Sequence, residues 1–219
     1  MNKHVKEIIT DKSKLEDWCI EIDPQKDGKL TQEIVLALKG TMRENNLCYL
    51  SAPQIGYNYR VICIRFGERD YRTFINPVIE NNVDMSFVRE TCCSYPDREF
   101  VMPRFNKVKF YFTTPMSKVE CATLQGHAAH ILQHAIEHLN GVLVDDIGLE
   151  IDDMFNTASE EEQQEVLKMY AESLDLRQKE LERIIEENEE LKQVNEAINF
   201  MNSVRDGTTI LENKHQEEK

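Results

Sequence analysis

Residues 133–141 read Gln133-His134-Ala135-Ile136-Glu137-His138-Leu139-Asn140-Gly141, and they end the predicted helix on which the fold depends. This helix is predicted over about residues 123–139, because Asn140-Gly141 is a normal helix end. His134 and His138 are four residues apart, so their side chains point to the same side of the helix. Two imidazoles placed in this way can bind one metal ion.

The same helix carries His127, His130, His134 and His138 close to one stripe, and only His4 and His215 lie elsewhere in the chain. A single histidine on a helix is usually structural. Four of them near one face indicate a metal site as readily as a structural role. A third ligand is then needed, and a cysteine thiolate would suit Zn²⁺ or Fe²⁺.

The position directly after His134 is unusual for a hydrolytic metal site. In the zinc-hydrolase pattern H-E-x-x-H, a Glu at this position acts as general base on the metal-bound water. The chain has Ala135 there, which cannot take a proton. A metal site, a disabled metal site and a helix that happens to carry histidines all remain open at this point.

The predicted elements do not alternate as βαβ units. A helix is predicted at about 31–44 with Thr31 as its N-cap, and strands at 60–66, 71–75 and 107–112. Pro77, Pro96 and Pro103 are expected to punctuate the strands. Together with the helix over 123–139, this order predicts an α+β fold.

The net charge of −14 is unevenly distributed along the 219 residues. Residues 1–150 contain 18 Lys and Arg against 21 Asp and Glu, while residues 151–219 contain 8 against 19. This difference predicts a globular domain followed by an acidic extension. The acidity argues against direct nucleic-acid binding, which needs a basic face.

The N-terminal residues are too polar for a signal peptide, and no run approaches the roughly 18 apolar residues of a membrane span. We therefore expect a cytoplasmic protein without a membrane partner. The six cysteines lack C-x-x-C spacing, and in such a compartment they would be reduced. Cys19, Cys48, Cys63 and Cys121 are expected to be small buried side chains.

From about Ser159 to Met201 the chain has no Pro or Gly and is dense in Glu, Gln, Lys and Leu. This composition and its heptads favour a long helix that forms a homodimeric coiled coil, and a helix that folds back on its own domain is the alternative. The predicted segments are a metal-binding domain at 1–155, a long helix at 156–202 and a disordered acidic tail at 203–219. The a positions are Leu167, Leu174, Leu181, Asn188 and Asn195, and the d positions are Tyr170, Arg177, Ile184, Leu191 and Ile198.

Three stretches resemble, in the same order, the signature motifs of peptide deformylases. Leu47-Cys48-Tyr49-Leu50-Ser51-Ala52-Pro53-Gln54 is similar to G-x-G-L-A-A-x-Q, Glu90-Thr91-Cys92-Cys93-Ser94 to E-G-C-L-S, and residues 133–141 to Q-H-E-x-D-H-L-x-G. The resemblance covers about residues 1–150. It implies antiparallel strands around a central metal-binding helix.

The resemblance also implies a role for each matching residue. Cys92, His134 and His138 match the ligands of one Fe²⁺ or Zn²⁺ ion, with a fourth position left to water. Gln54 matches the side-chain amide, and Cys93 the backbone N–H, that bind the formyl oxygen. The positions implied for substrate contacts are Tyr49, Glu90, Thr91 and Ile131, of which Ile131 would line the methionine pocket.

The implied reaction removes the formyl group from the N-terminal methionine of nascent polypeptides. A formyl-methionyl peptide or nascent chain is therefore the implied partner. Ala135 replaces the general-base Glu of the motif, and general acid–base catalysis contributes about 10²–10⁴-fold. Severely impaired activity follows, and the alternative is an inactive peptide-binding or oligomeric scaffold with the same fold.

Other positions also depart from the motifs. Leu47 and Tyr49 replace glycines and could narrow the peptide groove. Thr91 replaces the Gly before the ligand cysteine, and Cys93 replaces Leu. Glu137 replaces an Asp, which lengthens by one methylene a group that would support a ligand from behind.

Three accounts of Ala135 stay open. It could be an engineered Glu→Ala change made to trap a substrate. Alternatively, His134-x-x-Glu137-His138 matches the inverted pattern H-x-x-E-H, in which Glu137 would be the base. The third account is natural loss of the base in a domain that kept its fold, and the other motif changes favour this account.

Overall fold

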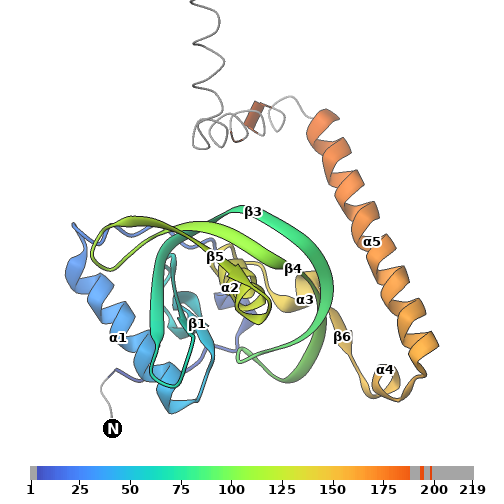
Figure 1. The fold of residues 1–219 in the computed structure, drawn as a ribbon, viewed down its shortest axis with the longest axis horizontal. Coiled ribbons are helices and arrows are strands. Elements are labelled where there is room, and N and C mark those ends of the chain that lie inside the picture. Colours follow the sequence, from blue (N-terminus) through green and yellow to red (C-terminus); the bar gives the residue numbers. More distant parts are fainter. Residues whose placement is uncertain (1–3, 188–192, 195–197, 199–219) are drawn as a thin grey trace, which may run out of the picture. The chain divides into compact units, whose positions relative to one another are not determined.

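The structure is a computed structural model that describes residues 4–187, 193–194 and 198 (Figure 1). It divides into two compact units, Met1–Asn156 and Thr157–Lys219. The predicted tail at 203–219 lies outside the described residues. So do the predicted heptad residues Asn188, Leu191 and Asn195.

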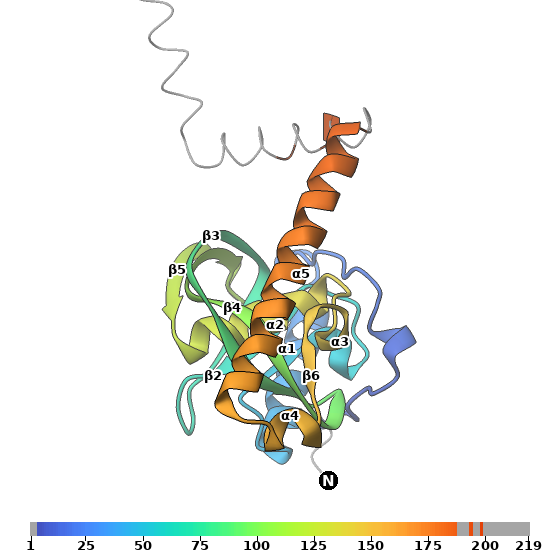
Figure 2. The ribbon, with the colours of Figure 1, turned by 90° about the vertical axis from the view of Figure 1, so that its right-hand side faces the viewer.

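The first unit is built on a six-stranded antiparallel sheet, which confirms the expected α+β class. Strands β1 to β5 follow one another in the sheet in chain order, and β6 pairs with β4 beside α3 (Figure 2). The strands are β1 (Tyr49–Ser51), β2 (Val61–Arg65), β3 (Tyr71–Cys92), β4 (Tyr95–Thr113), β5 (Val119–Gln125) and β6 (Leu149–Ile151). The helices are α1 (Gly28–Glu44), α2 (His127–Leu139), α3 (Val144–Ile147) and α4 (Asp153–Thr157), with 3-10 turns η1 (Lys12–Lys14) and η2 (Ala52–Ile55).

Strands β3 and β4 are much longer than the predicted strands at 71–75 and 107–112, which are only parts of them. The prolines do not end these strands. Pro77 lies where the register shifts between Ile75 and Val78, so its missing N–H falls at an irregular point of the ladder. Such shifts let two long strands bend, and in Figure 1 β3 and β4 curve around α2.

The start of α2 corrects the predicted helix over 123–139. Residues 119–125 form β5 and pair with β4, with Gln125 opposite Lys107. Gly126 follows with φ 58°, a left-handed conformation that glycine adopts without a steric penalty. The helix therefore begins at His127. The α1 helix likewise begins earlier than predicted, because Thr31 lies inside it and donates its N–H to the Asp27 carbonyl.

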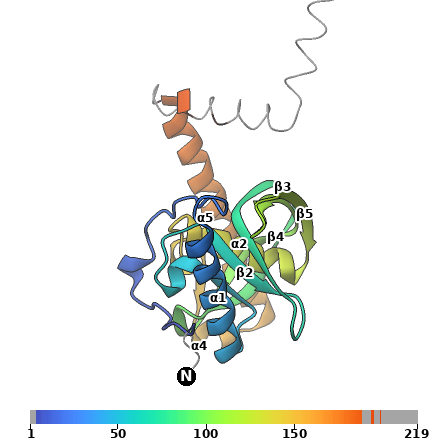
Figure 3. The same cartoon turned by 90° about the vertical axis from the view of Figure 1, so that its left-hand side faces the viewer.

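Strand β2 explains how the sheet and the helices share one core. Ile62 and Ile64 belong to the apolar cluster that contains α2, and Val61 and Cys63 belong to the cluster that contains α1. Successive strand side chains point to opposite faces, so this apolar run is buried on both sides. Figures 1 and 3 show α1 outside the strands and α2 inside the curve of the sheet.

Two of the four cysteines expected to be buried are exposed. Cys19 and Cys63 are buried, whereas Cys48 and Cys121 are exposed. Cys121 lies on the solvent-facing side of β5, because alternate side chains of that strand, such as Ala122 and Leu124, pack on the core.

The second unit contains α5 (Glu160–Glu187), which confirms a long helix after the domain. Its first turn is acidic, with Glu160, Glu161 and Glu162, and acidic side chains are favourable at the positive end of the helix dipole. Among the residues that the structure describes, no helix is long and apolar enough to cross a membrane.

Candidate metal centre

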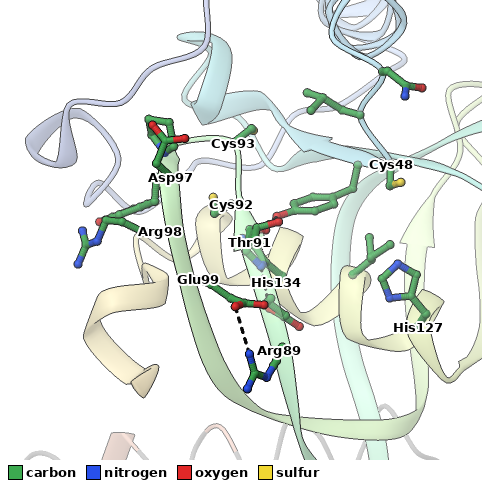
Figure 4. Close-up of a pocket in the computed structure, with 17 residues that line it drawn as sticks. Cys48, Arg89, Thr91, Cys92, Cys93, Asp97, Arg98, Glu99, His127 and His134 are labelled. Atoms are coloured by element: carbon green, nitrogen blue, oxygen red, sulfur yellow. Dashed lines mark hydrogen bonds and ion pairs between the residues drawn. The ribbon is translucent and has the colours of Figure 1, made fainter. Parts of the chain in front are cut away.

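Three buried side chains from two elements that are distant in sequence converge at the end of β3. Cys92 is the last residue of this strand, and His134 and His138 lie on α2. Their ligand atoms lie within 4.8 Å of one another, and Cys92 Sγ is 3.3 Å from His138 Nε2. Figure 4 shows Cys92 and His134 close together beside the cavity. One sulfur and two imidazole nitrogens fit Zn²⁺ or Fe²⁺, so these residues could hold such an ion.

His134 is oriented by a carboxylate on β3. Its Nδ1 lies 2.9 Å from Oε2 of Glu90. Glu90 and Cys92 are two residues apart on one strand, so both face α2. A hydrogen bond at Nδ1 leaves Nε2 as the nitrogen available to a metal, which is the usual arrangement of ligand histidines.

Arg104 joins the groups behind the two histidines. Its guanidinium is almost fully buried and donates to Glu90 from Nε at 2.8 Å and to Glu137 from Nη2 at 2.8 Å. Burial disfavours the ionised form of Glu90, but hydrogen bonds from His134 and Arg104 outweigh it and lower its pKa to about 2. Glu137 thus faces Arg104 rather than the ligand cluster.

The hydrogen bonds to Cys92 favour its thiolate form. A hydrogen bond from Cys93, together with those from His134 and His138, lowers the pKa of Cys92 far below its usual value. Burial alone would lower the pKa of His134, but its hydrogen bonds with Cys92 and Glu90 raise it to about 9. The thiolate is the form of cysteine that binds metals.

Gln54 reaches the cluster from η2. Its Nε2 lies 3.6 Å from Cys92 Sγ, 3.3 Å from Cys93 Sγ and 3.1 Å from Ser94 Oγ, and the side chain is fully buried. Its Oε1 accepts the N–H of Ser51 at 3.0 Å in a capping box. This local turn fixes the amide beside the candidate ligands.

A cavity of about 610 Å³ opens next to the cluster. Residues proposed for substrate contacts from the sequence line it, namely Tyr49, Glu90, Thr91 and Ile131, together with Cys93. Arg89 and Glu99 form an ion pair at 3.4 Å on its wall (Figure 4). No motif pointed to this pair, because its two residues meet only through the register of β3 and β4.

Two features of the site were not expected from the sequence. Of the four helix histidines, His127 lines the cavity and His130 bonds Asn106 Oδ1 at 2.8 Å, so neither belongs to the ligand cluster. The second feature is Tyr49, whose hydroxyl lies 2.9 Å from His134 Nε2. Ala135, by contrast, is fully buried and its carbonyl accepts the hydroxyl of Ser51 at 2.9 Å.

An antiparallel α+β domain with a buried Cys/His/His cluster of metal-ligand type is the class that the fold and the site define. A family model described as polypeptide deformylase matches residues 5–150. The chain therefore belongs to the polypeptide deformylase family, as the three motifs led us to expect.

Individual relatives agree with this assignment. A peptide deformylase from Natranaerobius thermophilus is 31% identical over 112 residues, which are 51% of this chain and 72% of that protein. One from Dictyoglomus turgidum is 27% identical over 65% of this chain and 95% of its own length. A crystal structure of a class I type b peptide deformylase from Acinetobacter baumannii with Met-Ala-Ser bound has a TM-score of 0.60 at 25% identity, over 65% of this chain and 97% of that one.

Proposed function

We propose that this chain is a metal-binding peptide deformylase homologue in which the hydrolysis of formyl-methionyl peptides is severely impaired. The observation that carries the proposal is Ala135, which directly follows His134 and has no group that can take a proton. The ligand atoms of Cys92, His134 and His138 nevertheless lie within 4.8 Å of one another. The site is thus equipped to hold a metal and not equipped to deprotonate water.

The neighbouring carboxylates are engaged elsewhere. Glu90 bonds both His134 and Arg104, and Glu137 accepts hydrogen bonds from Arg104. A carboxylate that is held by a guanidinium and turned away from the ligands is a poor candidate for general base, because a base must reach the proton that it removes. This argues against the inverted pattern in which Glu137 would replace the missing Glu.

The proposed cofactor is one Fe²⁺ or Zn²⁺ ion. When bound in sites of this class, such an ion polarises the carbonyl and activates water. The side-chain amide of Gln54 and the backbone N–H of Cys93 are proposed to donate to the formyl oxygen, and Gln54 lies beside Cys92 at 3.6 Å. Preorganised donors of this kind contribute about 3 kcal/mol each.

We infer that the base was lost naturally rather than removed by engineering. Tyr49 stands where the motif has Gly, and its hydroxyl contacts His134. A single engineered Glu→Ala change would not bring a second substitution to the same site. The natural coding sequence at codon 135 checks this directly, because a Glu codon there would contradict natural loss.

Peptide binding without hydrolysis is the second candidate function. The cavity of about 610 Å³ has the size of a small-ligand site, and Thr91 and Ile131 line it. The related Acinetobacter baumannii enzyme has been crystallised with Met-Ala-Ser bound. Calorimetry with formyl-Met-Ala-Ser checks this candidate, since heat of binding without formate release would support it.

The experiment that tests the main proposal measures metal content and formate release on the same preparation. We expect about one equivalent of metal, and formate release from formyl-Met-Ala-Ser at least about 100-fold slower than by the Dictyoglomus turgidum enzyme, because a general base contributes 10²–10⁴-fold. A rate near that of the active relative would overturn the impaired-activity proposal. A chain without metal would overturn the ligand assignment.

We also propose that the chain acts in the cytoplasm, where nascent polypeptides are made.

A separate proposal is that two copies associate through α5. Leu181 and Ile184 occupy a and d positions and are exposed on this helix. Light scattering of the full chain should give a dimer, and Leu181→Asp should shift it toward monomer. Leu176→Asp is the matched control, because Leu176 is exposed but lies outside the a and d positions. A monomeric wild type would contradict the dimer.

A further inference from the structure

Tyr49 reaches into the cluster of candidate ligand atoms. Its hydroxyl lies 2.9 Å from His134 Nε2 and donates to the Thr91 carbonyl at 3.4 Å. The Tyr49 and His134 rings are tilted by 58°, with centroids 4.8 Å apart. The contact therefore brings the phenol oxygen, rather than the face of the ring, to the imidazole nitrogen.

The nitrogen that Tyr49 meets is the one left for a metal. Nδ1 of His134 is occupied by Glu90 at 2.9 Å. In a tetrahedral site with metal–ligand distances of about 2.0–2.3 Å, neighbouring ligand atoms are about 3.3–3.8 Å apart. The Cys92 sulfur, at 3.3 Å from His138 Nε2, has that spacing. The Tyr49 oxygen lies at the shorter hydrogen-bond distance of 2.9 Å from His134 Nε2, so it is near enough to share a metal with this nitrogen after a small outward shift.

We propose that the Tyr49 hydroxyl is the fourth ligand of the Cys92/His134/His138 site and closes it to water. The inference rests on the metal binding of the proposed function, but not on the loss of the base at Ala135. Structural zinc sites have four protein ligands, whereas catalytic sites keep one position open. A glycine at position 49, as in the family motif, could not supply a ligand, so the closure is a property of this chain.

The closed site gives a physical reason for tolerating Ala135. The Tyr49 ring packs against the apolar cluster that contains Ala135 and Ile131. A carboxylate at position 135 would start from a fully buried point of this apolar cluster, where an unpaired charge is costly to desolvate. With no water to activate, it would bring no catalytic gain. The two departures from the motif are thus consistent with each other.

Zinc affinity is the first test. Tyr49→Phe keeps the ring and removes only the oxygen, so it should fold as the wild type does. Competition with a chromogenic chelator should show Zn²⁺ affinity lowered by at least about tenfold, since even groups that only support a ligand change affinity by 10–100-fold. Tyr57→Phe is the control, because its hydroxyl bonds Glu33 away from the site.

The second test uses Co²⁺ as a spectroscopic probe and azide as a small external ligand. In the Co²⁺-loaded wild type, azide should leave the visible spectrum unchanged because no position is open. Tyr49→Gly should open the position and give a saturable azide-dependent change, while Tyr57→Phe should behave as the wild type.

The outcomes separate this inference from the proposed function. Azide binding to the wild type as readily as to Tyr49→Gly, or unchanged Zn²⁺ affinity and Co²⁺ spectrum in Tyr49→Phe, would overturn the role of Tyr49 alone. Failure of the wild type to bind Zn²⁺ or Co²⁺ at all would overturn the metal site itself, and this inference with it.

Discussion

The candidate site has a ligand side, which keeps the groups that would hold a metal, and a reaction side, which lacks groups that hydrolysis needs. On the ligand side, His134 is held by Glu90, and Arg104 in turn holds Glu90 and Glu137. On the reaction side, Tyr49 and Ala135 stand where the family motifs have Gly and Glu. Holding a metal needs only donor atoms in place, whereas hydrolysis also needs a base and an open coordination position. A fold can therefore keep the first capacity and lose the second.

Restoring the reaction side should have the largest effect. The double variant Tyr49→Gly/Ala135→Glu supplies both an open position and a base, so its formate release from formyl-Met-Ala-Ser should rise by about 10²–10⁴-fold over wild type. Ala135→Glu alone should rise by less than about tenfold, because the fourth position stays closed. A single Ala135→Glu variant as fast as the double variant would show that Tyr49 does not block the site.

Damaging the ligand side should remove the metal itself. His134→Ala deletes a donor atom, and its Zn²⁺ affinity should fall by more than about 100-fold, beyond the loss expected for a supporting group. His130→Ala is the matched control on the same helix, because His130 bonds Asn106 instead of the cluster. Equilibrium dialysis measures the Zn²⁺ affinity of the two variants. Equal binding by the two variants would mean that the metal is held elsewhere.

The convergence of the proposed ligand residues could be predicted from the sequence, although their binding of a metal stays a proposal. The four-residue spacing of His134 and His138 predicts that they share one side of a helix. The match of residues 90–94 to a family motif identifies Cys92 as the third candidate ligand. Helical periodicity and short motifs are local properties, so they can be recognised without the fold. The structure brings Gln54, Cys92 and the two histidines together as those motifs implied.

The reaction side depends on contacts that no local pattern encodes. Tyr49 and His134 are 85 residues apart, and only the packing of β1 on α2 brings them to 2.9 Å. The sequence suggested that Tyr49 could narrow the groove, but not that its hydroxyl meets a ligand nitrogen. The sequence also underestimated the lengths of β3 and β4 for a similar reason. The hydrogen-bonded ladder between these two strands continues through polar stretches that lack the alternation expected of a strand.

The support behind the ligands should govern stability more than any exposed ion pair. Arg104→Met leaves Glu90 and Glu137 without their guanidinium partner, and breaking a buried pair in this way costs about 3–5 kcal/mol. Arg72→Met removes a pair with Asp70 that is exposed on both sides, and should cost less than about 1 kcal/mol. Urea unfolding measures the two free energies. Similar losses in both variants would contradict the structural role of Arg104.

The smallest effect on formate release should come from replacing Glu137. The size of this effect decides whether Glu137 belongs to the ligand side or to the reaction side. In a Tyr49→Gly background the fourth position is open and position 135 offers no base. If Glu137 supplied the base, Glu137→Gln would then lower formate release by about 10²–10⁴-fold. We expect a change of about tenfold at most, as for a group that only supports a ligand through Arg104. Glu137→Asp, which restores the residue of the family motif, should keep the contact with Arg104 and serves as the control. A loss of the larger size in Glu137→Gln alone would move Glu137 to the reaction side.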